Sequence, residues 1–149
     1  MLTNSRRAFL GALAGSAALA GCGVLDDEPE PVPQPDPFQP LLDEAVALAA
    51  AYDRVIVAQP GLASRLTPLA EDHRAHAGDL ARLIGAAVAS VAPSASAPSA
   101  AGDTTATLRK AEQAAQKNAA AACKTAPADR AALAGSIAAC RATHAEALR

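Results

Sequence analysis

The sequence predicts an all-α protein, an up-down bundle of four helices behind a non-globular N-terminal segment. Alanine makes up roughly 29% of the chain and aromatic residues only 2%, whereas alanine is far less frequent in average proteins. A core of alanine and leucine suits closely packed helices and suits a β-sandwich poorly. From residue 41 onward, apolar side chains recur every three or four residues, which is the spacing of one helix face. The formal net charge of −2 gives no reason to expect a nucleic-acid partner.

The N-terminus carries the pattern of an export signal. The sequence SRRAFL, residues 5–10, matches the twin-arginine pattern S-R-R-x-F-L, with Arg6 and Arg7 as the arginine pair. The Ala/Gly-rich run that follows is too short and too weakly apolar to span a membrane. We therefore expect residues 1–21 to be a signal peptide of the twin-arginine route, which carries proteins that fold before export.

The end of this signal predicts a lipid anchor. The sequence LAGC, residues 19–22, resembles a bacterial lipobox, in which cleavage precedes the cysteine and its thiol is diacylated. Each buried methylene of a lipid chain contributes about 0.8 kcal/mol, so two chains hold a protein stably on a bilayer. We expect a lipoprotein anchored through Cys22 to the outer face of the cytoplasmic membrane.

Residues 22–40 form the predicted tether. The stretch GVLDDEPEPVPQPDPFQP holds six prolines and five acidic residues. Such a composition favours an extended, disordered stalk with polyproline II character. The bundle is then expected over residues 41–149, where basic and acidic side chains nearly balance.

The four predicted helices occupy residues 41–59, 62–84, 104–124 and 128–148. Pro60 closes the first helix, and Pro68 either kinks the second or marks its true start. The Ala/Ser/Pro-rich segment 85–102 is a linker longer than a tight hairpin needs. Asp103 or Thr104 is expected to cap the third helix.

The interior-facing seams contain all three histidines of the chain. In the second helix, seven residues follow one another at intervals of four and three: Leu62, Leu66, Leu69, His73, His76, Leu80 and Leu83. The fourth helix repeats in the same way through Leu133, Ile137, Cys140 and His144. Because such repeats face the interior of a bundle, we expect these imidazoles to point inward.

Buried histidines need polar partners, because an unsatisfied buried polar group costs about 1–3 kcal/mol. If the first two helices form a tight hairpin, His73 faces Leu48, and His76 lies beside Glu44. On the third helix, one of two equally good seams turns Glu112 inward. The candidate cluster of nitrogen and oxygen ligands is then His73, His76, His144, Glu44 and Glu112.

Two main interpretations of this cluster remain open, and acid–base catalysis by the same groups is a third. Imidazole with carboxylate suits Fe, Zn or Cu. Alternatively, the same groups satisfy one another by hydrogen bonds, or His73 and His76 lie at the edge of the seam and reach solvent. We favour the hydrogen-bonding interpretation on the sequence alone.

Cys123 and Cys140 remain outside the membrane, where oxidation is allowed, and their number favours a disulfide. A tight turn between the last two helices would offset them by about 13 Å along a helix, which is beyond bridging distance. A bridge would therefore need residues 125–135 to form a wide corner, and a single helix from 128 to 148 would argue against it. A metal site that pairs Cys140 with His144 is a further option.

Three stretches of the predicted bundle carry a family resemblance. The export signal, the stalk and the sequences AAYDRVIVAQPGLASRLTPLAEDHRAH, LRKAEQAAQKNAAAAC and SIAACRATHAEAL resemble actinobacterial lipoproteins of ferritin-like type. The resemblance covers most of residues 41–149 and implies an up-down four-helix bundle with a long second connection. Ferritin-like di-iron proteins carry Glu-x-x-His on two helices, but this chain has no such motif. The resemblance therefore implies the fold without the di-iron centre.

No complete catalytic motif is present, whether G-x-S-x-G, a glycine-rich phosphate loop or His-Glu-x-x-His. We expect a membrane-anchored, non-enzymatic bundle that acts in binding or in envelope structure, with a protein partner that the sequence does not identify. The alternative is a metal-binding or redox protein that uses the inward His/Glu cluster.

Overall fold

The computed structural model describes residues 34–88, 102 and 104–149. The expectations for Arg6, Arg7 and Cys22 therefore lie outside the described residues. So do most of the tether and most of the linker between the second and third helices.

The described residues are helical apart from short turns and ends. The elements are α1 (Gln39–Ala58), the 3-10 helix η1 (Pro60–Leu62), α2 (Ala63–Ile84), α3 (Thr105–Thr125) and α4 (Ala128–Ala147). This confirms the all-α class and the four-helix arrangement. No helix among the described residues combines the length and apolar character needed to cross a bilayer.

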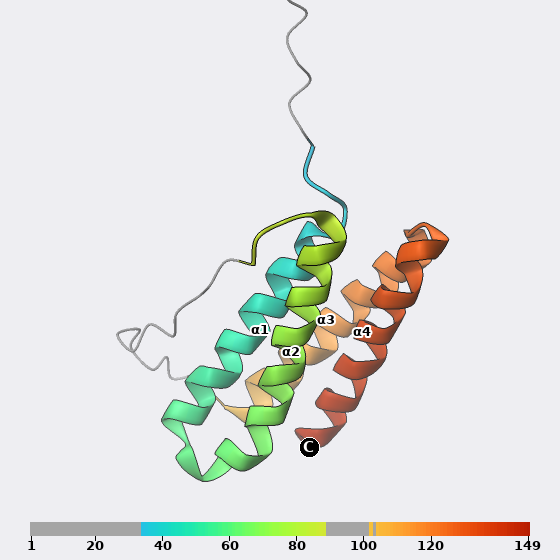
Figure 1. Ribbon diagram of the computed structural model, residues 1–149. Helices are drawn as coiled ribbons and strands as arrows, with labels where there is room; N and C mark the ends of the chain where they lie inside the picture. The colour runs from blue at the N-terminus through green and yellow to red at the C-terminus, as the bar shows by residue number, and fades with distance from the viewer. Residues whose placement is uncertain (1–33, 89–101, 103) are drawn as a thin grey trace, which may run out of the picture. The chain divides into compact units, whose positions relative to one another are not determined.

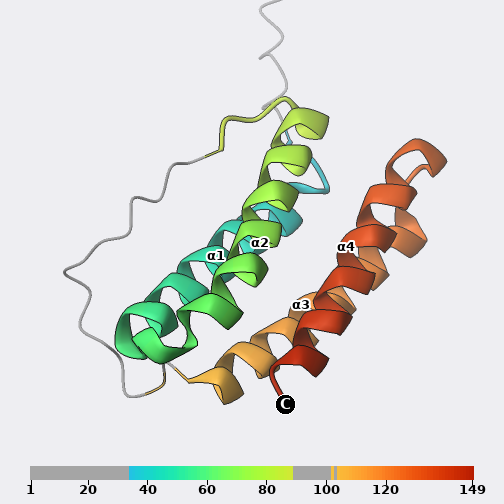
Figure 2. The same cartoon turned by 60° about the horizontal axis from the view of Figure 1, so that its bottom comes forward.

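The helices associate as two hairpins. α1 packs along α2, and α3 packs along α4 (Figure 1). The turned view shows the same two pairs (Figure 2). The closest packing between the hairpins is that of α1 on α3.

α1 begins before the predicted end of the tether. Asp36 accepts a hydrogen bond from the backbone N–H of Phe38 and pairs with Arg130 of α4 at 2.7 Å. Phe38 is buried in the core, and Pro40 lies in the first helical turn, where its missing N–H is no loss. The last residues of the predicted tether thus belong to the bundle.

The ends of the other helices follow local chemistry. Pro68 lies inside α2, so it does not mark the start of that helix. Gly85 ends α2 with φ +69°, the left-handed conformation that glycine adopts without strain. Thr104 caps α3 through reciprocal hydrogen bonds with Thr107, as expected for one of the two candidate caps.

The buried apolar side chains form two clusters towards opposite ends of the helices. One consists of Phe38, Leu41, Leu42, Ala45, Ala77, Leu80, Ala81, Ala119, Ala134, Ile137 and Ala138. The other consists of Tyr52, Val55, Leu66, Ala70, Leu108 and Leu148. Four buried polar residues fall between these clusters along their helices: His73, Glu112, Arg141 and His144. We call these four residues the polar layer.

Candidate metal centre

Glu112 lies at the centre of the polar layer. Its Oε1 atom accepts hydrogen bonds from Tyr52 Oη at 2.6 Å, from His73 Nε2 at 2.6 Å and from His144 Nδ1 at 3.3 Å. Burial raises the pKa of Glu112, but the hydrogen bonds from His144, His73 and Tyr52 outweigh it and lower this pKa to about 2. Glu112 is therefore a carboxylate that gathers donors from three other helices.

Tyr52 is the phenol donor of this arrangement. Burial and the hydrogen bond to Glu112 raise its pKa above the usual range, so the hydroxyl keeps its proton. Its ring lies 5.4 Å from that of His73, centroid to centroid. The sequence did not predict Tyr52 as part of the site, because a tyrosine on an apolar helix face gives no sign of where its hydroxyl points.

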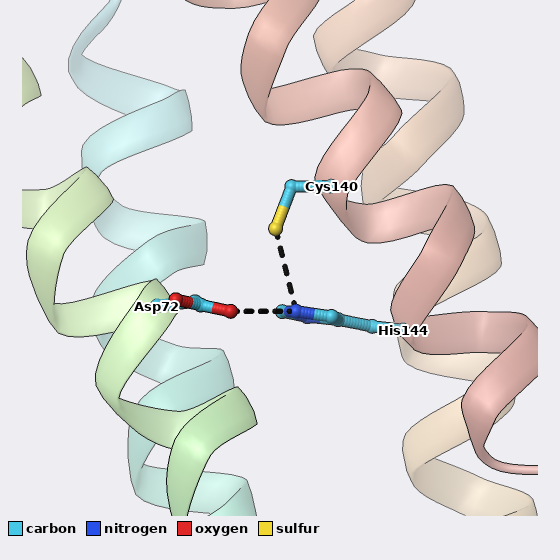
Figure 3. Close-up of side chains that lie close together, drawn as sticks. All are labelled: Asp72, Cys140 and His144. Atoms are coloured by element: carbon cyan, nitrogen blue, oxygen red, sulfur yellow. Dashed lines mark hydrogen bonds and ion pairs between the residues drawn. The ribbon is translucent and has the colours of Figure 1, made fainter.

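His144 has acceptors on both sides of its ring. Its Nδ1 atom faces Glu112, and its Nε2 atom lies 3.1 Å from Asp72 Oδ2 and 3.3 Å from Cys140 Sγ (Figure 3). Burial lowers the pKa of His144, but its hydrogen-bonded partners Cys140 and Glu112 outweigh this and raise it to about 10. The imidazole is therefore protonated on both nitrogens at neutral pH when no cation replaces a proton.

The expectation that Glu44 partners His76 is wrong. Glu44 pairs with Arg141 Nη1 at 2.9 Å and accepts a hydrogen bond from Asn118. The 3-10 turn η1 shifts the pairing of α1 with α2, so that Tyr52, and not Leu48, packs against His73.

His76 lies at the edge of the seam and not among the converging ligand atoms. It is half-buried, and its ring stands edge-on to that of His73, with centroids 6.3 Å apart. Burial, with a smaller contribution from the positive charge of Arg141, lowers the pKa of His76, so it is neutral at pH 7.

Arg141 is a buried cation that the sequence interpretation missed. Its side chain is fully buried, and its Nη1 atom donates to the carbonyl of Ala115 at 2.9 Å in addition to Glu44. The helical spacing could have predicted its burial, since Arg141 lies four residues after Ile137 and three before His144. It was overlooked because arginine on a helix is usually placed on the solvent side.

The expected disulfide is not formed. Cys123 and Cys140 are both free, and α4 runs unbroken from Ala128 to Ala147. Cys123 Sγ lies 3.3 Å from the carbonyl oxygen of Ala131, whereas Cys140 points at His144. The tight turn places the two thiols at different heights along α3 and α4, as the helical offset between them requires.

Unpartnered polar atoms concentrate in and beside the polar layer. Among the described residues, the buried atoms without a hydrogen bond include His73 Nδ1, His76 Nδ1, Glu112 Oε2, and Nε and Nη2 of Arg141. Each such atom costs about 1–3 kcal/mol. Mutual hydrogen bonding therefore accounts for only part of this layer.

Within the described part of the chain, two groups of side chains bring potential metal-ligand atoms within 4.8 Å of one another. The inner group is His73, Glu112 and His144, and the outer group is Asp72, Cys140 and His144. The inner group contains three of the five predicted ligands, whereas Glu44 and His76 lie outside both groups. Asp72 was not among the predicted ligands, but it reaches His144 across from α2.

The inner group matches the spacing of tetrahedral ligands. Bonds of about 2.0–2.1 Å to a zinc-sized ion set ligand atoms about 3.3–3.4 Å apart. His144 Nδ1 lies 3.3 Å from Glu112 Oε1 and 3.4 Å from His73 Nε2. The third separation, His73 Nε2 to Glu112 Oε1, is a hydrogen bond of 2.6 Å that needs to lengthen by less than 1 Å.

In comparisons with protein-family models, curated proteins and solved structures, nothing matches this chain. Its function is therefore inferred from the chemistry and geometry of these two groups.

Proposed function

We propose that this chain is an exported lipoprotein whose helical bundle binds one transition-metal ion through His73, Glu112 and His144. The observation that carries the proposal is the convergence of three ligand atoms from three helices in a fully buried layer. One further buried atom of this group, Glu112 Oε2, has no hydrogen-bond partner and could also bind such an ion.

The arrangement of protons also favours a cation. With Glu112 ionised, His73 Nε2 and His144 Nδ1 both donate to its Oε1 atom while lying 3.4 Å from each other. Two N–H groups of like partial charge then face each other. A metal ion would use the lone pairs of both nitrogens and one oxygen, and would replace this repulsion with three bonds.

The ligand set defines the kind of ion. Two imidazoles and one carboxylate suit Zn, Fe or Cu, and do not suit Mg or Ca, which prefer oxygen ligands alone. A single carboxylate at the centre and the absence of Glu-x-x-His favour one ion over a di-iron cluster. The ferritin-like type remains part of this proposal, supported by two antiparallel hairpins separated by a long connection.

The burial of the inner group favours binding over catalysis. His73 and Glu112 have no exposed surface, so a substrate has no direct approach to an ion held between them. The ion would join α2 of one hairpin to α3 and α4 of the other, where protein contacts are sparser than within each hairpin. We therefore propose a non-enzymatic role in metal binding that also stabilises the bundle.

The anchoring of this bundle to a membrane rests on the twin-arginine pattern and the lipobox. Cys22→Ser should move the protein from the membrane fraction to the soluble fraction and remove the mass of the lipid. Changing Arg6 and Arg7 together to Lys should stop export through the twin-arginine route. An unchanged mass and membrane fraction in Cys22→Ser would contradict lipidation.

Metal binding is tested by titrating the full chain, in a Cys22→Ser background, with Zn²⁺, Cu²⁺ or Fe²⁺. The unsubstituted bundle should bind one ion. His73→Ala should weaken binding by about 100-fold or more, since it removes a ligand. His76→Ala is the matched control, because it removes a neighbouring imidazole of the same helix and should change the affinity by less than about threefold.

Two results would contradict the proposal. One is the absence of stoichiometric metal both after native export and after reconstitution. The other is an equal loss of binding in His73→Ala and His76→Ala when circular dichroism shows that both variants are folded.

A further inference from the structure

The outer group lies on the solvent side of the inner one. Asp72 of α2 points across to α4, where Cys140 and His144 lie one helical turn apart (Figure 3). The Nε2 atom of His144 is 3.1 Å from Asp72 Oδ2 and 3.3 Å from Cys140 Sγ. The Asp72 side chain is 55% exposed, whereas that of Glu112 is fully buried.

This geometry suits a metal ion with a thiolate ligand. Residues four apart on a helix share a face, which is how paired ligands of one helix reach the same ion. Around a tetrahedral zinc-sized ion, nitrogen and oxygen ligands lie about 3.3 Å apart and nitrogen and sulfur about 3.5 Å apart. The two separations in the outer group fall within about 0.3 Å of these values. The fourth position is left to water on the exposed side.

The two groups share one imidazole, and this makes them alternatives. The outer group uses Nε2 of His144, and the inner group uses Nδ1. A neutral imidazole has one lone pair, so an ion held through one nitrogen leaves the other carrying a proton. That N–H has an acceptor in either case. The acceptor is Glu112 when the ion is bound by the outer group, and Asp72 when the ion is bound by the inner group.

The inner group needs a route by which an ion reaches it. His73 and Glu112 are fully buried, and His144 is only 2% exposed. Among the described residues, the outer group of ligands is accessible from solvent and also shares His144 with the buried centre.

We propose that Asp72, Cys140 and His144 form a second, solvent-facing metal site that receives the ion and passes it to the buried centre. The transfer changes the coordinating atom of His144 from Nε2 to Nδ1, and the ring proton of His144 is exchanged from Nδ1 to Nε2. The ligands Cys140 and Asp72 are exchanged for His73 and Glu112, and the released thiolate of Cys140 takes up a proton from solvent. This inference rests on the proposed function, since the buried centre is the destination of the ion.

The test uses Co²⁺ as the probe with the reduced full chain in the Cys22→Ser background. Thiolate ligation to Co²⁺ produces a sulfur-to-metal charge-transfer absorption, which nitrogen and oxygen ligands do not. On rapid mixing, this absorption should rise and then decay as the ion moves inward. In His73→Ala the absorption should persist, because the ion has no buried centre to enter.

Two substitutions remove outer ligands and keep all three ligands of the buried centre. Cys140→Ala should abolish the transient absorption and slow loading by about tenfold or more, while one ion per chain is still bound at the end. Asp72→Asn should also slow loading, as Cys140→Ala does. The matched controls are Cys123→Ala, a thiol that lies elsewhere on α3, and Glu71→Gln, an exposed carboxylate next to Asp72.

Several outcomes would overturn the transfer. Loading of Cys140→Ala at the unsubstituted rate would show that the thiol takes no part. A thiolate absorption that persists in the unsubstituted bundle and is indifferent to His73→Ala would place the final ion in the outer group, which refutes the buried centre as well. Filling of the buried centre without any thiolate absorption would refute the outer site alone.

Discussion

Glu112 Oε1 lies 2.6 Å from His73 Nε2, and both side chains are fully closed to solvent. A carboxylate with a lowered pKa, held in the core by an imidazole, is costly to bury unless each of its partners remains in place. This pair fixes the contact between α2 of one hairpin and α3 of the other. Glu112 and His73 are also two of the three proposed metal ligands.

Glu112→Gln should destabilise the metal-free bundle, because it replaces a carboxylate with an amide that accepts fewer and weaker hydrogen bonds from the same donors. The free energy of unfolding, measured by urea denaturation with a chelator present, should fall by about 2–4 kcal/mol. The control is Glu146→Gln, since the ion pair of Glu146 with Arg149 is exposed and should matter by less than about 1 kcal/mol. Equal effects of the two substitutions would contradict the central role of Glu112.

The pairing of Arg141 with Glu44 should show strong coupling in a double-mutant cycle. Glu44→Gln leaves a fully buried guanidinium without its carboxylate and should cost about 2 kcal/mol of stability, less than a fully buried pair because Glu44 is partly exposed. Arg141→Met, added to Glu44→Gln, should recover much of this loss, because it removes the uncompensated charge. Simple additivity of the two substitutions in urea denaturation would contradict the buried ion pair.

Metal binding should release a proton. The pKa of His144 is raised to about 10, so at pH 7 its Nδ1 atom carries a proton that the ion must displace. The apparent affinity should therefore rise by about tenfold per pH unit from pH 6 to pH 9. Calorimetry in buffers of different ionisation enthalpy measures the released proton directly, and an affinity independent of pH would contradict this assignment.

Both cysteines of the bundle should remain free under mild oxidation. Cys123 faces Ala131 at the turn between α3 and α4, and Cys140 faces His144, so a bridge would require α4 to break. Thiol titration of the folded protein should find both groups after air oxidation. A mass lower by two hydrogens, with a melting temperature that falls on reduction, would show a disulfide instead.

The helical seams were predictable because they depend only on the spacing of apolar residues. On α1, Leu41, Leu48 and Val55 recur at intervals of seven residues and are all buried. On α3 the structure selects the seam that turns Glu112 inward, one of the two that the spacing allowed. Burial of His73 and His144 follows from the same periodicity.

The partners of these residues were not predictable in the same way. The short 3-10 helix that begins at Pro60 moves the pairing of α1 with α2, and this puts Tyr52 beside His73. Periodicity identifies the face of a helix but not the height at which a facing helix meets it. For that reason Glu44 was assigned to His76 when its actual partner is Arg141.

The width of the core-facing stripe explains the other differences. On α2 the buried residues are Leu66, Ala70, His73, Ala77, Leu80 and Ala81, so the stripe lies to one side of the predicted seam. His76 therefore falls at its edge, and Asp72, four residues earlier on the same flank, reaches across to α4. Because the stripe is wide and lined by small alanines, the sequence spacing does not decide which residues at its edge contact α4. Packing against α4 decides it.

The central claim is that one ion lies between His73, Glu112 and His144. Anomalous X-ray diffraction from crystals of the protein loaded with Zn²⁺, with data collected on both sides of the zinc edge, tests it most directly. We predict an anomalous peak about 2.0–2.2 Å from His73 Nε2, His144 Nδ1 and a carboxylate oxygen of Glu112. A peak that occurs only elsewhere on the chain, or no peak in the polar layer at full zinc loading, would contradict it.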